Sequence, residues 1–109
     1  MTSLTERRCR PCDGKVAAYS AEQAQVELKQ LSSDWCLIED GKAIERDFAF
    51  RDFYRTMSFV NALAHVANTE DHHPDLKVGY GYCHVTYSTH SIGGLSVNDF
   101  ICAAKLDRL

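Results

Sequence analysis

The sequence predicts an α+β domain in which a single four-stranded antiparallel sheet carries three helices on one face. Segments with apolar residues at helical spacing alternate with pairs of short strand-like segments, and glycines mark the turn within each pair. The chain of 109 residues is long enough for one domain. The predicted order is α-β-β-α-β-β-α, with residues 1–15 as a flexible polar arm and residues 16–109 as the folded domain.

The first helix and the first strand pair have clear local signals. A helix is predicted from about Ser20 to Leu31, because Ser20 is a favoured N-cap and Gln23 stands three residues later, as in a capping box. Residues 35–38 and 42–50 are strand-like, and Asp40-Gly41 between them is a strong turn signal. A hairpin of this kind makes its two strands antiparallel.

The second helix is the longest. It is predicted from about Asp52 to Asn68, since a residue that precedes Pro74 is pushed out of helical geometry. Its predicted buried stripe consists of Phe53, Met57, Val60, Ala64 and Ala67.

Two more strands and a last helix complete the pattern. The strands are predicted at about residues 76–80 and 82–89, with Val85 and Tyr87 on the face opposite His84, Thr86 and Ser88. The helix is predicted at about residues 97–106, with Ser96 as N-cap and Asp99 as its N3 partner.

The overall composition narrows the class of function. The net charge of −3 argues against nucleic acid as the main partner, because phosphate binding needs a basic surface. No apolar run approaches membrane-spanning length, and the first ten residues lack the apolar core of a secretory signal, so we expect a cytoplasmic protein without membrane contact. A chain this small often gains buried surface by self-association, which predicts a homo-oligomer.

Four of the five histidines fall between residues 72 and 90. The strand after His73 runs away from the loop, and the strand before His90 runs back, so an antiparallel hairpin brings these histidines together. Imidazole is the side chain best suited to proton transfer near neutral pH, because its ordinary pKa is about 6.5. The cluster of His72, His73 and His90 therefore predicts acid–base chemistry in one pocket.

Metal and thiol chemistry are the competing interpretations. Adjacent residues of an extended chain point to opposite sides, which makes His72 and His73 poor joint ligands. Cys9-x-x-Cys12 is one half of a zinc pattern without a second pair, so free thiols are the favoured interpretation of the odd set of five cysteines. We expect no metal. Trp35 is either a core residue or an apolar wall for a flat heterocycle.

Several of these segments together resemble one family, pterin-4a-carbinolamine dehydratase. The resemblance covers about residues 20–107 and rests on Trp35 and on the segments Glu70-Asp71-His72-His73-Pro74-Asp75, Val85-Thr86-Tyr87-Ser88-Thr89-His90, Gly93-Gly94-Leu95-Ser96 and Asn98-Asp99-Phe100. The Cys9-x-x-Cys12 arm also looks like bacterial members that serve phenylalanine hydroxylase.

The resemblance implies a hydro-lyase without cofactor or metal. Its substrate would be the 4a-hydroxytetrahydropterin left by an aromatic amino acid hydroxylase, and its product quinonoid dihydropterin. A single sheet backed by helices, assembled as a homodimer or homotetramer, is also implied. The alternative function is a non-catalytic module that binds a regulatory protein or stabilises its dimer, as some family members do.

The resemblance also implies roles for individual residues. His72 and His90 are the candidates for proton transfer, in either order, while His73 binds and orients the pterin. The predicted substrate-binding residues are Trp35, Pro74, Thr89, Ser91 and Asp99. Asp99 is expected to hold the second ring nitrogen of His90. The family usually has an ionisable residue four positions before the first histidine, and this sequence has Asn68 there.

Overall fold

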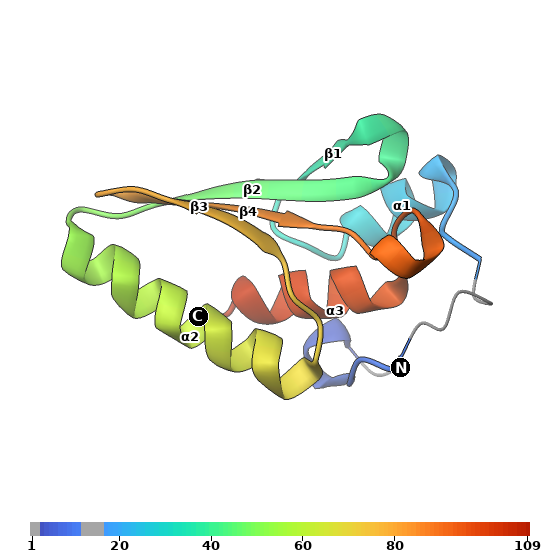
Figure 1. The fold of residues 1–109 in the computed structure, drawn as a ribbon. Coiled ribbons are helices and arrows are strands. Elements are labelled where there is room, and N and C mark those ends of the chain that lie inside the picture. The colour runs from blue at the N-terminus through green and yellow to red at the C-terminus, as the bar shows by residue number, and fades with distance from the viewer. Residues whose placement is uncertain (1–2, 12–16) are drawn as a thin grey trace.

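The structure confirms the predicted α+β fold and the order of its elements. It is a computed structural model that describes residues 3–11 and 17–109. The helices and strands are α1 (Ala21–Leu28), β1 (Cys36–Ile38), β2 (Ala43–Ala49), α2 (Phe53–Glu70), β3 (Asp75–Val78), β4 (Tyr82–Tyr87) and α3 (Val97–Leu106). All strand pairs are antiparallel in the order β1-β2-β4-β3, and α2 and α3 run beneath the sheet (Figure 1).

Two helices, α1 and α3, begin at the predicted capping residues Ser20 and Ser96, and α2 begins beside Asp52, near its predicted start. Ser20 accepts a hydrogen bond from the Gln23 amide at 3.1 Å, and the Gln23 side chain accepts one from the Ser20 amide. The same reciprocal capping box joins Ser96 and Asp99 at the start of α3. Asp52 caps α2 through the amide of Arg55. These local bonds satisfy amides that have no partner inside the helix, which is why short sequence signals located the helix starts.

The sheet separates two environments as the alternation in β4 predicts. Val85 and Tyr87 are fully buried against the helices, whereas His84 lies on the opposite face between Glu45 and Asp47. Arg46 interrupts the apolar inner row of β2. Its guanidinium lies 4.2 Å from the centre of the Phe48 ring and pairs with a carboxylate of Asp107, so the buried charge is compensated.

The predicted buried stripe of α2 is partly wrong. Phe53 is half exposed and Ala64 is exposed, while the buried residues are Thr56, Leu63, Ala67 and Glu70. This row has helical spacing but contains two polar residues. Thr56 donates to the backbone oxygen of Tyr80 or of Asp52, and Glu70 binds Lys105, so both polar side chains are satisfied in the interface. The helix also continues two residues beyond the predicted end, which places Glu70 in the stripe.

The described part of the N-terminal arm is packed against the domain. Leu4 belongs to the hydrophobic core with 5% of its surface exposed, and its short 3₁₀ turn, Leu4–Glu6, contacts α3. The arm then continues along the end of α2 through Cys9 and Arg10. Cys12 and Lys15 lie outside the described residues. Within the described residues, no helix combines the length and the apolar character needed to span a membrane.

Candidate active site

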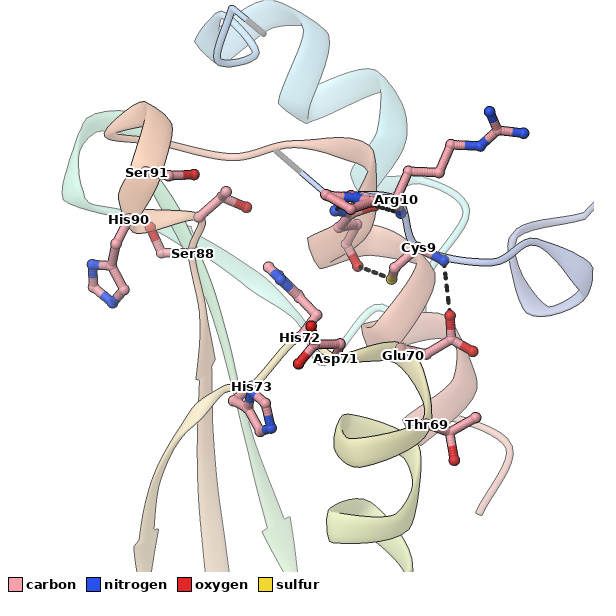
Figure 2. Close-up of a pocket in the computed structure, with 13 residues that line it drawn as sticks. Cys9, Arg10, Thr69, Glu70, Asp71, His72, His73, Ser88, His90 and Ser91 are labelled. Carbon is pink, nitrogen blue, oxygen red and sulfur yellow. Dashed lines mark hydrogen bonds between the residues drawn. The ribbon is translucent and has the colours of Figure 1, made fainter. Parts of the chain in front are cut away.

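A pocket of about 550 Å³ opens where the C-terminal ends of α2 and β4 meet the arm (Figure 2). Its volume lies within the range of about 300–1,000 Å³ typical of small-molecule sites. It is lined by Cys9, Arg10, Pro11, Thr69, Glu70, Asp71, His72, His73, Ser88, Thr89, His90, Ser91 and Asn98. Three of the five histidines therefore face one cavity, together with hydroxyl and carboxylate groups.

The end of α2 and the β3–β4 pairing bring the histidines together. Asp71 adopts the left-handed conformation, with φ 52°, and its amide and that of His72 both bond to the Ala67 oxygen. This reversal ends the helix and directs the chain into β3. Because Asp75 at the start of β3 pairs with Thr86 near the end of β4, the segment after α2 lies beside the segment that carries His90.

His72 is the most firmly held of the three imidazoles. Its Nε2 lies 2.6 Å from Oδ1 of Asp99, and its ring stacks on Tyr87 with centroids 5.7 Å apart and planes within 7°. Burial by itself lowers the pKa of His72, but the hydrogen bond and negative charge of Asp99 outweigh it, so the pKa is raised. Asp99 thus favours the charged imidazolium inside the pocket.

Asp99 is itself completely buried and fully occupied. Its Oδ2 accepts hydrogen bonds from the Thr89 hydroxyl at 2.7 Å and from the Ser96 amide at 3.0 Å. The expectation that Asp99 holds the second nitrogen of His90 is wrong, because Asp99 binds His72 instead. After the turn at Asp71, His72 points inward to the first turn of α3, where it meets the Asp99 carboxylate. His90 follows Thr89 on an exposed turn instead.

His73, His90 and Ser91 form the exposed rim of the pocket. His90 begins a short 3₁₀ turn, His90–Ile92, which ends at Gly93 in the left-handed conformation (φ 68°). The turn is closed by the Thr89 amide, which donates to the Gly94 oxygen at 2.8 Å. Within the described residues, the rings of His73 and His90 make no hydrogen bond, so a ligand in the cavity has access to both.

The arm forms a wall of the pocket that the sequence did not predict. The Cys9 amide donates to Oε1 of Glu70 at 2.8 Å, and Arg10 exchanges two backbone–side-chain bonds with Asn98. Burial raises the pKa of Glu70, but its bonds to Lys105 and the Cys9 amide, and the charge of Arg8, lower it overall. Glu70 is therefore a carboxylate that fastens the arm to α2 and α3.

Two of the predicted substrate-binding residues, Trp35 and Pro74, do not line the pocket. Trp35 is 2% exposed, packs against Phe48 and Tyr87, and donates its Nε1 hydrogen to Asp107 at 2.7 Å, so its ring does not line the pocket. A large ring with one polar N–H is well placed in a core that offers a carboxylate. Pro74 also lies outside the lining residues, next to His73.

The polar residues just before His72 differ in whether they reach the pocket and whether other groups already bind them. Asn68, four positions before His72, is exposed on α2 and does not line the pocket. Glu70 and Asp71 both do, but Glu70 is occupied by the arm and Lys105. Asp71 is the exposed carboxylate at the cavity. Among the described residues, no group of three or more ligating side chains could hold a metal ion.

The fold and pocket define a small α+β protein with an open, histidine-lined cavity whose volume suits a small molecule. Comparison with known proteins identifies the family: the sequence model of pterin 4 alpha carbinolamine dehydratase matches residues 17–109. The chain belongs to this family.

Relatives of similar length support the assignment. A protein of Legionella pneumophila (strain Lens), provisionally named pterin-4-alpha-carbinolamine dehydratase, is 54% identical over 100% of this chain and 97% of its own. One from Nitrosomonas europaea with the same provisional name is 55% identical, covering 97% and 92%.

Two solved structures share the fold. A transcriptional coactivator/pterin dehydratase from Brucella melitensis has 30% identity and a TM-score of 0.78, covering 84% of this chain and 96% of that one. A pterin dehydratase-like protein described as a RuBisCO assembly factor in the alpha-carboxysome has 22% identity and a TM-score of 0.60, over 69% and 87%, and shows likeness of fold alone.

Proposed function

We propose that this protein is a dehydratase that removes water from a 4a-hydroxytetrahydropterin to give quinonoid dihydropterin. The observation that carries the proposal is the buried His72–Asp99 pair in a cavity that also exposes His73 and His90. Family membership and the names of the full-length relatives support the substrate class.

The reaction needs two proton transfers. The C4a–O bond breaks as the hydroxyl accepts a proton and leaves as water, and N5 loses its proton as the C4a–N5 double bond forms. A charged imidazole supplies the first proton and a neutral base takes the second. Water and the dihydropterin together account for all atoms of the substrate, so no oxidant or cofactor is consumed.

We assign the acid to His72, because Asp99 raises its pKa and thereby increases the imidazolium fraction near neutral pH. Since Nε2 is bound to Asp99, Nδ1 is the ring atom left to face the leaving hydroxyl. His90, across the pocket, is the base, and His73 orients the pterin between them. Asp71 is a carboxylate able to bind the ring N–H groups of a pterin at the cavity.

Stopped-flow absorbance of freshly generated carbinolamine tests this proposal. The wild-type protein is expected to accelerate dehydration, and a variant with both His72→Ala and His90→Ala is expected to abolish the acceleration. His65→Ala is the matched control, because His65 is an exposed histidine of α2 outside the pocket. Full activity in the double variant would refute histidine catalysis.

The cellular role follows from the same substrate. We propose that the protein works in the cytoplasm and returns the pterin cofactor of an aromatic amino acid hydroxylase, with phenylalanine hydroxylase as the functional partner. Loss of the protein is then expected to slow hydroxylase turnover only when the pterin is limiting. An unchanged rate at limiting pterin would contradict this role.

A second candidate function is a protein-binding module, acting as a homo-oligomer or on a regulatory protein. Large apolar side chains are exposed at the start of α2, on β3, and in the turn from β3 into the start of β4: Phe53, Tyr54, Leu76, Val78, Tyr80 and Tyr82. Exposed apolar patches commonly mark interfaces, and the Brucella melitensis relative carries a coactivator name. Light scattering should give a homodimer or homotetramer, and a monomer at all concentrations would count against self-association.

A further inference from the structure

The arm and α3 bring two cysteines into contact beside the active-site pocket. Sγ of Cys9 lies 3.5 Å from Sγ of Cys102, although the two residues are 93 positions apart in the chain. Cys102 is fully buried in α3, whereas Cys9 is half-buried and lines the pocket. The other described cysteines, Cys36 and Cys83, are not in this cluster.

Hydrogen bonds from the arm backbone to side chains of α2 and α3 hold the two cysteines in contact. The amide of Cys9 is fixed by Glu70, and the next residue, Arg10, is fixed by both polar atoms of the Asn98 side chain. The Cys9 thiol also lies 3.6 Å from the Asn98 backbone oxygen. Cys102 is one helical turn beyond Asn98 on α3. The sulfur pair is therefore part of how the arm docks.

The two sulfurs differ in acidity. The hydrogen bond with Cys9 lowers the pKa of Cys102 against the effect of burial, and the charge of His72 and the Tyr87 hydroxyl lower it further. The same hydrogen bond, together with burial, raises the pKa of Cys9. Of the two sulfurs, Cys102 is thus the one whose thiolate form the surroundings favour. A thiolate next to a thiol is the arrangement in which a disulfide forms readily.

We propose that Cys9 and Cys102 are a redox modification site, oxidised by a peroxide to a disulfide that ties the arm to α3 and restrains the active site. The Cys102 thiolate attacks one peroxide oxygen, the O–O bond breaks, and a sulfenic acid and hydroxide form. The Cys9 sulfur then attacks the sulfenic sulfur, forming the S–S bond as water leaves. The two thiols lose two electrons and two protons, and the peroxide becomes two molecules of water.

Disulfide formation changes the pocket as well as the arm. A disulfide requires the sulfurs to be about 2.05 Å apart, so they must approach by roughly 1.5 Å. Cys102 lies within a packed helix, so the arm makes most of this movement. Cys9 is part of the pocket wall, and Tyr87, which belongs to the same hydrophobic core cluster as Cys102, is the ring on which His72 stacks. Oxidation therefore shifts the wall and alters the support of His72.

Peptide mapping after oxidation tests the site directly. The purified full chain is treated with one equivalent of hydrogen peroxide, remaining thiols are alkylated, and the protein is digested with trypsin. The expected product links residues 9–15 to residues 78–105, and fragmentation places the bond at Cys102 rather than Cys83. A bond between Cys9 and Cys12 within one peptide, or alkylation of both Cys9 and Cys102, overturns the proposal.

Variants separate this bond from other thiol chemistry. Cys12→Ser and Cys36→Ser are expected to form the Cys9–Cys102 bond, because neither residue takes part in it. Cys102→Ser is expected to leave Cys9 open to alkylation. If Cys12→Ser prevents formation of the linked peptide, Cys12 is the true partner and the proposal is wrong.

The effect on the active site rests on the proposed dehydratase function, whereas the mass measurement does not. A displacement of about 1 Å near reacting groups can cost up to about 100-fold in rate, so the oxidised Cys12→Ser protein is expected to lose about tenfold in kcat/KM. Dithiothreitol should restore it. A linked peptide with unchanged activity overturns the restraint on the site, and a linked peptide in a protein inactive in both states overturns only the proposed function.

Discussion

The histidines on the two sides of the pocket differ in how firmly the protein holds them. On the inner side, His72 is stacked on Tyr87 and bonded to a carboxylate with no exposed surface, which itself has further partners. On the outer side, His90 stands on an exposed 3₁₀ turn. The protein fixes the position and charge of the first ring, whereas the second is positioned by its turn and by what enters the pocket.

The inner side of the pocket contains a buried carboxylate, Asp99, and burying a charge costs free energy. A buried carboxylate is costly unless its oxygens are all bonded, and Asp99 meets this condition through His72, Thr89 and the Ser96 amide. The same residue also caps α3. The start of α3 and the orientation of the His72 ring therefore depend on one side chain, so a change at Asp99 affects both.

Removal of His72 should have the largest effect on activity. General acid or base groups contribute about 10²–10⁴-fold, and we expect His72→Ala to lose near the upper end of that range in kcat and His90→Ala near the lower end. Stopped-flow measurement of both variants gives the order. A greater loss in His90→Ala would reverse the comparison between the two sides.

Asp99→Asn should have the next largest effect. Hydrogen bonds to charged groups are worth about 1.5–3 kcal/mol, which corresponds to roughly 10- to 100-fold in rate if His72 is the acid. Thr89→Ser, which keeps the hydroxyl bonded to Asp99, should stay close to wild type. Equal kcat values in Asp99→Asn and wild type would mean that the carboxylate serves only the helix cap.

The pH dependence of the free energy of unfolding should differ between the wild-type protein and Asp99→Asn. The pKa of His72 is raised in the folded state, so its stabilising contribution is complete below the unfolded pKa of about 6.5 and is lost as the pH rises through the folded pKa. In wild type, the urea midpoint should therefore fall from pH 6.5 upward. In Asp99→Asn the fall should be smaller, because the variant lacks the negative charge of Asp99, which raises the pKa of His72 against the effect of burial. Parallel curves would contradict the pairing.

Trp35→Phe should affect activity least. The substitution removes the hydrogen bond from Nε1 to Asp107 while keeping an aromatic ring in the core, so we expect a stability loss of about 1 kcal/mol or somewhat more. Since the ring lies outside the pocket, kcat/KM should stay within about twofold of wild type. A large rise in KM would show that Trp35 contacts the substrate in the functional assembly.

The sequence predicted those features that depend on neighbouring residues. Ser20, Asp52 and Ser96 mark helix starts because each bonds an amide within three residues. The alternation in β4 predicted its buried face because side chains of a strand point alternately to its two sides. The hairpin pairing then implied that His72, His73 and His90 lie together, and the structure places all three at one cavity.

Features that depend on distant contacts were not predictable in the same way. Glu70 belongs to the buried stripe of α2 only because Lys105 and the arm neutralise and bond it, and apolar patterning gives no weight to a glutamate. From the sequence, Asp99 could pair with either His72 or His90. In the structure it pairs with His72, which follows the left-handed turn at Asp71. Docking of the arm depends on Asn98, which has no distinguishing local pattern.

The proposed mechanism requires that Asp99 holds His72 in its charged form while His72 acts on the substrate. The most direct test is to titrate the His72 ring by NMR in wild type and Asp99→Asn and to measure kcat/KM over the same pH range. We predict a His72 pKa above 6.5 that coincides with a kinetic inflection, and a downward shift of both in Asp99→Asn. A kinetic inflection that stays in place while the NMR pKa moves would contradict the account.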